Sequence, residues 1–296
     1  MLKKIRQGSQ SYSQYFYLLP SFLFVVLVEI APAIYTISIS FQEWDLLYPP
    51  SWVGLSNYLK IFADPTIIQA VLNSFAWIIV SLLLTGVLAL ILAVFINSFN
   101  KITQSVFTII FVAPYVFSPT IAGKVFVRIF SSTSGGINSI LKLIGMSDFS
   151  LSWLTLTGPF IVPINTILTV IAFSWRYLGL NLLLFLVGLS SIPKYYSEAA
   201  EIDGANQWQI FYHVTLPLLR PITLLVVANT IINTWRMFSV PWVMTGGGPG
   251  RASETLALTM YRESFLLFNA GFGAAIAVFI AIIGLLLSGR WLRSYS

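Results

Sequence analysis

The chain has no cysteine and one histidine, His213, among its 296 residues. Disulfide bonds and thiolate metal sites are therefore excluded, and a metal site built on histidines is not expected. Charged residues are scarce at 9% of the chain, against about 25% in soluble domains. The few basic residues are scattered singly and no base-stacking module accompanies them, so no nucleic-acid partner is expected.

What the chain has in place of charge is hydrophobic residues, which make up 57% of it. This composition predicts an all-α integral membrane protein surrounded by membrane lipid. The length leaves room for about six spans of about 20–25 residues and little room for a separate soluble domain. The expected spans are residues 15–41, 70–96, 105–130, 159–189, 218–244 and 271–292, and the fourth is expected to be interrupted at Trp175-Arg176-Tyr177.

The N-terminus carries Lys3, Lys4 and Arg6 ahead of the first apolar run. Such a basic start could belong to a signal peptide, and Ala31-Pro32-Ala33 resembles a cleavage site. The apolar run continues to residue 41, however, which is long enough to span a membrane. We therefore expect a retained first helix.

The same basic residues predict the orientation of the chain. Three cations precede the first span and none follows it before Lys60, so the N-terminus should be cytoplasmic. Six spans place the C-terminus on the same side. The expected organisation is a cytoplasmic tail at 1–14, a first span and outer loop at 15–69, and a transmembrane core at 70–292 that contains a cytoplasmic loop at 190–217.

Glu29 lies inside the first expected span. A carboxylate within a membrane is a candidate functional group by default. It could equally be a structural group that faces a pore or pairs with another chain. Both interpretations stay open.

The loop at 198–217 holds Glu198, Glu201 and Asp203 within six positions. Burying several carboxylates in a bilayer is very costly, so this loop must be exposed to water. Ser197 could cap a first helix, Gly204 permits a bend, and a second helix over 207–214 should stop before Pro217. Such a helix–bend–helix has the form of a docking surface, although an ordinary amphipathic connector would look similar.

The loop also carries a motif. Glu198-Ala199-Ala200, Gly204, Val214 and Leu216-Pro217 follow the spacing EAA-x3-G-x9-I-x-L-P, with Val214 in place of Ile. This pattern resembles the EAA signature of permease subunits in binding-protein-dependent ABC importers. Residues 54–58 (GLSNY) and 246–249 (GGGP) resemble two further elements of the maltose-type permeases of sugar importers. The resemblance implies the six-helix type I ABC importer permease fold.

The resemblance also implies a role for the loop as a coupling helix that seats in a cytoplasmic ATPase. The coupling residues would be Glu198, Ala199, Ala200, Asp203, Gly204, Val214, Leu216 and Pro217. The implied partners are a second, homologous permease, an ABC ATPase dimer and an extracytoplasmic solute-binding protein. The chain lacks the GxxxxGK[ST] pattern of a nucleotide site, so ATP and Mg²⁺ would belong to the ATPase. No cofactor and no enzymatic activity are expected in this chain. Its expected location is the cytoplasmic membrane of a bacterium or archaeon.

Polar residues inside spans usually face the interior of a bundle or a water-filled path. Asn229 and Asn233 lie four residues apart and share a helix face. Aromatic rings beside amides and hydroxyls suit a sugar, which has apolar faces and polar edges. The candidate path residues are Phe173, Tyr177, Asn229, Asn233, Thr234 and Met237. The alternative for each is helix–helix packing or hydrogen bonding.

Rival functions follow from other residues. An ion-coupled secondary transporter could use Glu29 or the intramembrane arginines, and it would have no need of a docking loop. A membrane enzyme would need a convergent catalytic set that the chain lacks. A permease for glycerol phosphate or another polar solute is a closer alternative, in which Arg176 or Arg236 could meet the phosphate. Outside that alternative, these arginines and His213 are interpreted as structural.

Overall fold

The computed structural model describes residues 17–133, 135–146, 151–158 and 162–292, with side chains as far as residue 287. The expected tail at 1–14 and the start of the fourth expected span at 159 lie outside these residues. The chain forms two compact units: Met1–Ile61 with Met260–Phe279, and Phe62–Thr259 with Ile280–Ser296. They are called the first and second units below. The domain boundaries expected at residues 14 and 69 stay predictions.

The first unit begins with a helix over Tyr17–Ser40. Within it, a π-helical turn, η1 (Val26–Ile30), leads into α2 (Ala31–Ser40), whose first turn contains Pro32. Proline lacks an N–H group and is tolerated in a first turn, and the wider π turn before it accommodates the lost hydrogen bond. Glu29 lies in the π turn and is exposed.

A short hairpin follows α2. Strands β1 (Gln42–Glu43) and β2 (Ser51–Trp52) pair antiparallel, with Gln42 opposite Trp52. The GLSNY segment closes it: Gly54 has a φ of +58°, and α3 (Ser56–Ala63) begins two residues later. Asn57 Nδ2 donates to the carbonyl oxygens of Ser40 and Gln42 at 3.0 and 2.8 Å. The segment therefore holds α3 against the end of the first span.

The C-terminal part of the first unit is helical. It contains the end of α15 (Leu256–Tyr261), the π turn η5 (Arg262–Leu266) and the start of α16 (Ala270–Leu292). Gly271 packs on the hairpin, and an added Cβ there would lie 1.9 Å from the carbonyl oxygen of Gln42. Only glycine permits this approach.

The second unit starts with one long span, Pro65–Asn97, made of α4 (Pro65–Ser81), the π turn η2 (Leu82–Val87) and α5 (Leu88–Asn97). Asp64 caps it by accepting a hydrogen bond from the backbone N–H of Thr66 at 2.8 Å. Burial raises the pKa of Asp64, but its hydrogen bonds with Thr66 and the positive charge of Arg251 outweigh that effect, and the pKa lies below its usual value.

The third expected span, 105–130, is not one helix. It divides into α6 (Lys101–Val116) and α7 (Pro119–Ile129), which are bent by 100°. The helix breaks there because Pro119 disfavours a helical conformation at the residue before it. Ser118 is extended and caps α7 instead. Beyond the bend lie α8 (Gly136–Leu143) and η3 (Trp153–Thr155).

The central helix of the second unit is α9 (Ile164–Ser191), which runs through Trp175, Arg176 and Tyr177 without the interruption expected there. At Gly179 an added Cβ would lie 1.9 Å from the carbonyl oxygen of Phe111 on α6. The glycine therefore lets α6 pack directly on α9.

The fifth expected span, 218–244, is also divided. Helix α13 (Arg220–Trp235) ends, and α14 (Ser239–Met244) begins after a short turn. Pro241 has no N–H to donate to the carbonyl of Met237, and that carbonyl accepts from Thr255 Oγ1 at 3.0 Å instead. The expected break after Met244 is present, with Gly246 and Gly247 at positive φ.

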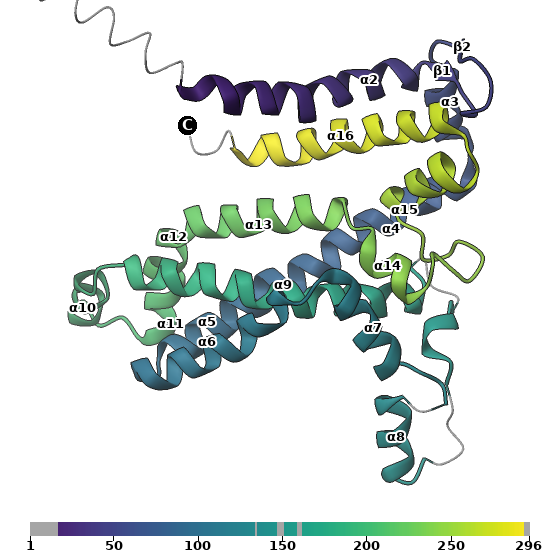
Figure 1. The fold of residues 1–296 in the computed structure, drawn as a ribbon. Helices are drawn as coiled ribbons and strands as arrows, with labels where there is room; N and C mark the ends of the chain where they lie inside the picture. The colour runs from purple at the N-terminus through teal and green to yellow at the C-terminus, as the bar shows by residue number, and fades with distance from the viewer. Residues whose placement is uncertain (1–16, 134, 147–150, 159–161, 293–296) are drawn as a thin grey trace, which may run out of the picture. The chain divides into compact units, whose positions relative to one another are not determined.

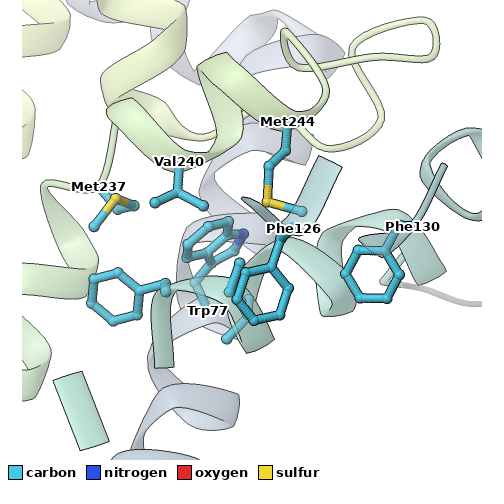
Figure 2. Packing of buried hydrophobic residues seen from close by; sticks show 9 residues of the cluster. Trp77, Phe126, Phe130, Met237, Val240 and Met244 are labelled. Atoms are coloured by element: carbon cyan, nitrogen blue, oxygen red, sulfur yellow. The ribbon is translucent and has the colours of Figure 1, made fainter. Parts of the chain in front are cut away.

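Four helices in the described residues are long and apolar enough to cross a membrane, and the count rises to six if each of two bent pairs forms one span. The bent pairs are α6 with α7, and Gln207–Leu218 with Arg220–Trp235. This count is consistent with the six spans expected. Two apolar clusters pack around α9. One joins α4, α7, α9 and α14, and Figure 2 shows it around Trp77, Phe126 and Met244. The other joins α5, α9 and α13.

Candidate functional site: a helix–bend–helix foot

Residues 195–218 form a compact element at one end of α9, which we call the foot (Figure 1). Its first helix is α10 (Tyr195–Ile202). Gly204 then adopts a φ of +83°, and its backbone N–H donates to the carbonyl of Glu201 at 3.0 Å. A left-handed residue just past a helix end is a common way to satisfy terminal carbonyl groups, and glycine adopts it without strain. The bend expected at Gly204 is present.

The second part of the foot contains α11 (Gln207–Ile210), the π turn η4 (Phe211–Thr215) and α12 (Leu216–Leu218). Asn206 and Gln209 form a capping box: Asn206 Oδ1 accepts from the N–H of Gln209, and Gln209 Oε1 accepts from the N–H of Asn206. This cap was readable as Asn-x-x-Gln in the sequence and is missing from the sequence-based expectations.

Two local expectations for the foot are wrong. Ser197 does not cap α10, because the helix begins two residues earlier and Ser197 Oγ donates to the carbonyl of Lys194 at 2.8 Å. The second helix does not stop before Pro217. The π turn η4 precedes that proline, which falls in the first turn of α12, so the helical path continues to Leu218 before a 66° bend into α13.

The foot exposes apolar side chains as well as acidic ones. No residue of α10 is buried. Ile202 is 87% exposed and Trp208 is 74% exposed. Large apolar groups on a polar, protruding element are typical of a surface that another molecule covers.

Most of the expected coupling residues line two hollows of the foot. Glu198 and Ala199 are exposed on α10. A cavity of about 350 Å³ on the inside of the bend is lined by Ala200, Asp203, Gly204, Ala205, Gln209, Ile210, His213 and Val214. Leu216 and Pro217 line a second, apolar groove together with Tyr212, Arg220, Thr223 and Leu224. His213 Nδ1 lies 3.0 Å from the carbonyl oxygen of Gln209.

The candidate path residues come from α9, α13 and the turn after α13. Phe173 and Met237 are buried in one apolar cluster, and Tyr177 packs against it. The rings of Phe173 and Tyr177 lie 4.4 Å apart. These three residues are therefore brought together, and in the described conformation Phe173 and Met237 serve as packing residues.

The amide candidates lie on α13. Asn233 Nδ2 donates to the backbone oxygen and to Oδ1 of Asn229, both at 2.8 Å, so the two share a face as expected. Both are partly exposed. Thr234 is buried, and its hydroxyl has no hydrogen-bond partner among the residues that the structure describes. A buried hydroxyl without a partner is costly, which makes Thr234 a candidate for contact with a water or a solute.

A buried polar network was not expected from the sequence. Asn181 on α9 donates through Nδ2 to the backbone oxygen of Thr85 at 2.9 Å and to Thr230 Oγ1 at 3.0 Å. Thr85 lies in the π turn η2, where the backbone pattern changes and a carbonyl is free to accept. The network joins α9, α13 and the second span. A single Asn in an apolar run was the only sequence signal.

A second glycine-containing element, residues 245–255, follows α14, and we call it the clasp. Asn73 on α4 donates to the carbonyls of Ala252 and Glu254 at 2.8 and 3.0 Å. Asn165 on α9 donates to the carbonyl of Gly248 at 2.7 Å. Arg251 Nε lies 2.5 Å from Glu254 Oε2, and the Glu254 side chain is 1% exposed. The clasp is therefore fastened to two helices.

This arrangement is that of a multi-pass helical membrane protein with an exposed helix–bend–helix at one end of its central helix. In the described part of the chain, no group of three or more His, Cys, Asp or Glu side chains could hold a metal ion. A model of the family of binding-protein-dependent transport system inner membrane components matches residues 85–295.

Relatives extend this match over nearly the whole chain. The arabinooligosaccharides transport system permease protein AraP of Halalkalibacterium halodurans is 33% identical over 93% of this chain and 85% of its own length. The sn-glycerol-3-phosphate transport system permease protein UgpA of Brucella abortus is 30% identical over 94% of this chain and 93% of its own length. A chain of a bacterial alginate ABC transporter, solved with an alginate pentasaccharide-bound periplasmic protein, shares the fold with a TM-score of 0.82 at 20% identity. The match covers 97% of this chain and 94% of that one.

This chain belongs to the family of binding-protein-dependent transport system inner membrane components. It is an ABC transporter permease, a membrane transport subunit rather than an enzyme. The resemblance inferred from the EAA, GLSNY and GGGP segments and the expected fold class are thereby confirmed.

Proposed function

We propose that this chain is the permease subunit of an ATP-driven importer and forms half of the path for a sugar or oligosaccharide. Its foot docks on a separate cytoplasmic ATPase dimer, which holds ATP and Mg²⁺. A second, homologous permease completes the path, and an extracytoplasmic binding protein delivers the solute. Both termini lie in the cytoplasm of a bacterium or archaeon. The observation that carries the proposal is the exposed foot with its motif residues around the Gly204 bend.

Coupling in this proposal is a rigid-body motion. Closure of the ATPase dimer pushes the foot, and the foot transmits the motion to α9 and α13, between which it lies in the chain. Because the ATPase holds the foot differently in its open and closed states, it shifts the permease between inward-open and outward-open forms. Glu198 bonds a cationic group of the ATPase, and Ala199 and Ala200 allow close seating.

A sugar as solute is supported by the name of the arabinooligosaccharide relative and by the mixture of aromatic and amide side chains on α9 and α13. Solute contacts are assigned to Tyr177, Asn229, Asn233 and Thr234, while Phe173 and Met237 pack behind them. Glycerol phosphate is the second candidate, supported by the glycerol-phosphate relative and by the arginine at position 176. An ion-coupled transporter is disfavoured by the family to which the chain belongs.

The decisive experiment compares two glycine substitutions in the complex reconstituted in proteoliposomes. Gly204→Asp places a side chain at a φ of +83°, with no atom within 4 Å of the new Cβ. Gly145→Asp is the matched control, since that residue has a φ of +91° and the same open surroundings but lies after α8. Gly204→Asp should spare insertion and abolish ATP-driven uptake, whereas Gly145→Asp should leave uptake unchanged.

A second measurement tests the contact directly. Cysteine at Ala200 in this cysteine-free chain should cross-link to the ATPase subunit. Uptake by Gly204→Asp at the wild-type rate, or the absence of any cross-link from position 200, would refute the coupling role.

A further inference from the structure

The membrane-spanning helices of the second unit carry basic side chains and no acidic ones. Helices α4, α5, α6, α7, α9, α13 and α14 contain no Asp or Glu. Their basic residues are Lys101, Lys124, Arg128, Arg176 and Arg220. Basic groups without acidic partners make the local potential positive, and Lys and Arg line pathways for anions in membrane proteins.

Arg176 lies near the middle of α9, far from either helix end, and is partly buried. Its Nε donates to the carbonyl oxygen of Phe117 at 2.8 Å, at the point where α6 ends. Its guanidinium carbon lies 4.9 Å from the centre of the Tyr115 ring and 5.0 Å from that of Tyr177. One hydrogen bond and two aromatic faces therefore fix the orientation of the cation.

This arrangement leaves most of the donors of the guanidinium unused. Arginine has five N–H donors, of which the carbonyl of Phe117 accepts one. Within the described residues, Arg176 forms no ion pair and its terminal amino groups form no hydrogen bond. The hydroxyls of Tyr115 and Tyr177 are likewise without a hydrogen-bond partner there. An arginine inside a membrane span usually marks a solute or ion path.

Arg176 also adjoins the proposed path. Tyr177 is the next residue, and its ring lies 4.4 Å from that of Phe173. Tyr115 contacts Tyr177 edge to face at 5.8 Å. A solute that reaches Tyr177 therefore comes within reach of the guanidinium.

We propose that Arg176, with the hydroxyls of Tyr115 and Tyr177, is a binding site for an oxyanion, and that the solute carries a carboxylate or a phosphate. The planar guanidinium offers two parallel N–H donors, which match either group. The proposal rests on the transport function proposed above and narrows its solute from sugars in general to acidic or phosphorylated ones. The partly buried cation of Arg176 gains a counterion when an anionic solute binds, whereas a neutral sugar supplies none.

The test uses the full-length chain, within its complex, in lipid nanodiscs. Calorimetric titration measures binding of three probes: sodium digalacturonate for a carboxylate, sn-glycerol 3-phosphate for a phosphate, and maltotriose as the neutral probe. We expect one anion to bind saturably and more tightly than maltotriose. The anion that binds shows whether the solute carries a carboxylate or a phosphate. Equal or tighter binding of maltotriose, or no saturable binding of either anion, would overturn the proposal without any variant.

Variants then assign the binding to the residue. Arg176→Gln should weaken binding of the preferred anion by about 10- to 100-fold, since hydrogen bonds to charged groups are lost. Arg176→Lys should weaken anion binding less, because lysine keeps the positive charge and lacks only the two parallel N–H donors of the guanidinium. Lys101→Gln removes one positive charge at the exposed start of α6 and should leave binding unchanged. An Arg176→Gln protein that melts like wild type and binds as tightly would also overturn the proposal.

ATP-driven uptake separates this inference from the function on which it rests. If the chain is not an importer subunit, the complex will show no ATP-dependent uptake of any probe. If only the oxyanion site is wrong, ATP-dependent uptake will occur for the neutral probe and will be insensitive to Arg176→Gln.

Discussion

The foot and the clasp are both short glycine-containing elements of the second unit, but they are held in opposite ways. The foot keeps its shape through its own backbone, with the Gly204 turn and the Asn206 cap, and it exposes Ile202 and Trp208. The clasp is fastened from outside by Asn73 and Asn165, and it buries the carboxylate of Glu254.

This difference indicates what each element does. An element that is self-supporting and exposed can receive another protein without first giving up contacts. An element whose backbone is bonded to two helices fixes the distance between those helices. We therefore expect changes in the clasp to alter stability, and changes in the foot to alter assembly and coupling.

The largest loss of stability is expected from Arg251→Gln. The substitution removes the guanidinium of Arg251 from the carboxylate of Glu254, which is 1% exposed. Arg251 is itself 28% exposed, so the cost should reach at most about 3–5 kcal/mol, the range for a fully buried pair. The melting temperature of the purified chain in detergent should fall clearly, whereas Arg236→Gln, at an exposed arginine, should hardly change it. Equal melting of the two variants would show that the clasp does not stabilise the unit.

A smaller loss is expected from Asn73→Ala. It removes both hydrogen bonds to the clasp carbonyls of Ala252 and Glu254. A hydrogen bond of this kind contributes about 0.5–1.5 kcal/mol, so the two together are worth about 1–3 kcal/mol. Gln69→Ala is the matched control, because Gln69 donates only to Asn73 Oδ1 and leaves both donors of Asn73 in place. A Gln69→Ala variant as unstable as Asn73→Ala would attribute the loss to α4 and not to the clasp.

Within the foot, Asn206→Ala should have a local effect. Loss of an N-cap costs about 1 kcal/mol, and a self-supporting element can lose this without global unfolding. Amide hydrogen exchange over residues 207–210 should accelerate while the melting temperature stays nearly constant. Asn206→Ser restores a capping oxygen and should restore protection. A fall in global stability instead would mean that the foot is not an independent element.

The sequence could predict the foot because its chemistry is local. Acidic residues excluded it from the bilayer, Gly204 marked the bend, and the EAA spacing marked the family. The helix limits were less predictable. Ser197 was a plausible cap, but α10 begins at Tyr195, and the π turn before Pro217 lets the chain remain helical where a simple proline rule predicts an end.

The long-range features could not be predicted, since they depend on residues far apart in the sequence. Asn73 and Glu254, or Asn181 and Thr85, meet only in the folded unit. Two spans are divided near Pro119 and Pro241, although hydropathy treats each apolar run as continuous. Pro119 disfavours a helical conformation at Ser118, and Pro241 lacks a backbone donor. The buried position of Phe173 also depends on tertiary packing, which an aromatic residue in a span does not reveal.

The smallest effect on stability, and the most selective effect on function, is expected from Ile202→Ser. Ile202 is 87% exposed, so the isolated chain should change in stability by less than about 0.5 kcal/mol. If the ATPase covers this side chain, the complex loses its burial, worth about 1.5–3 kcal/mol, and association should weaken about 10- to 100-fold. Leu143→Ser on α8 is the matched control, because Leu143 is 85% exposed but lies outside the foot. Titration of the reconstituted permease pair with the ATPase measures the affinity of each variant. Equal affinity for the two variants would place Ile202 outside the contact.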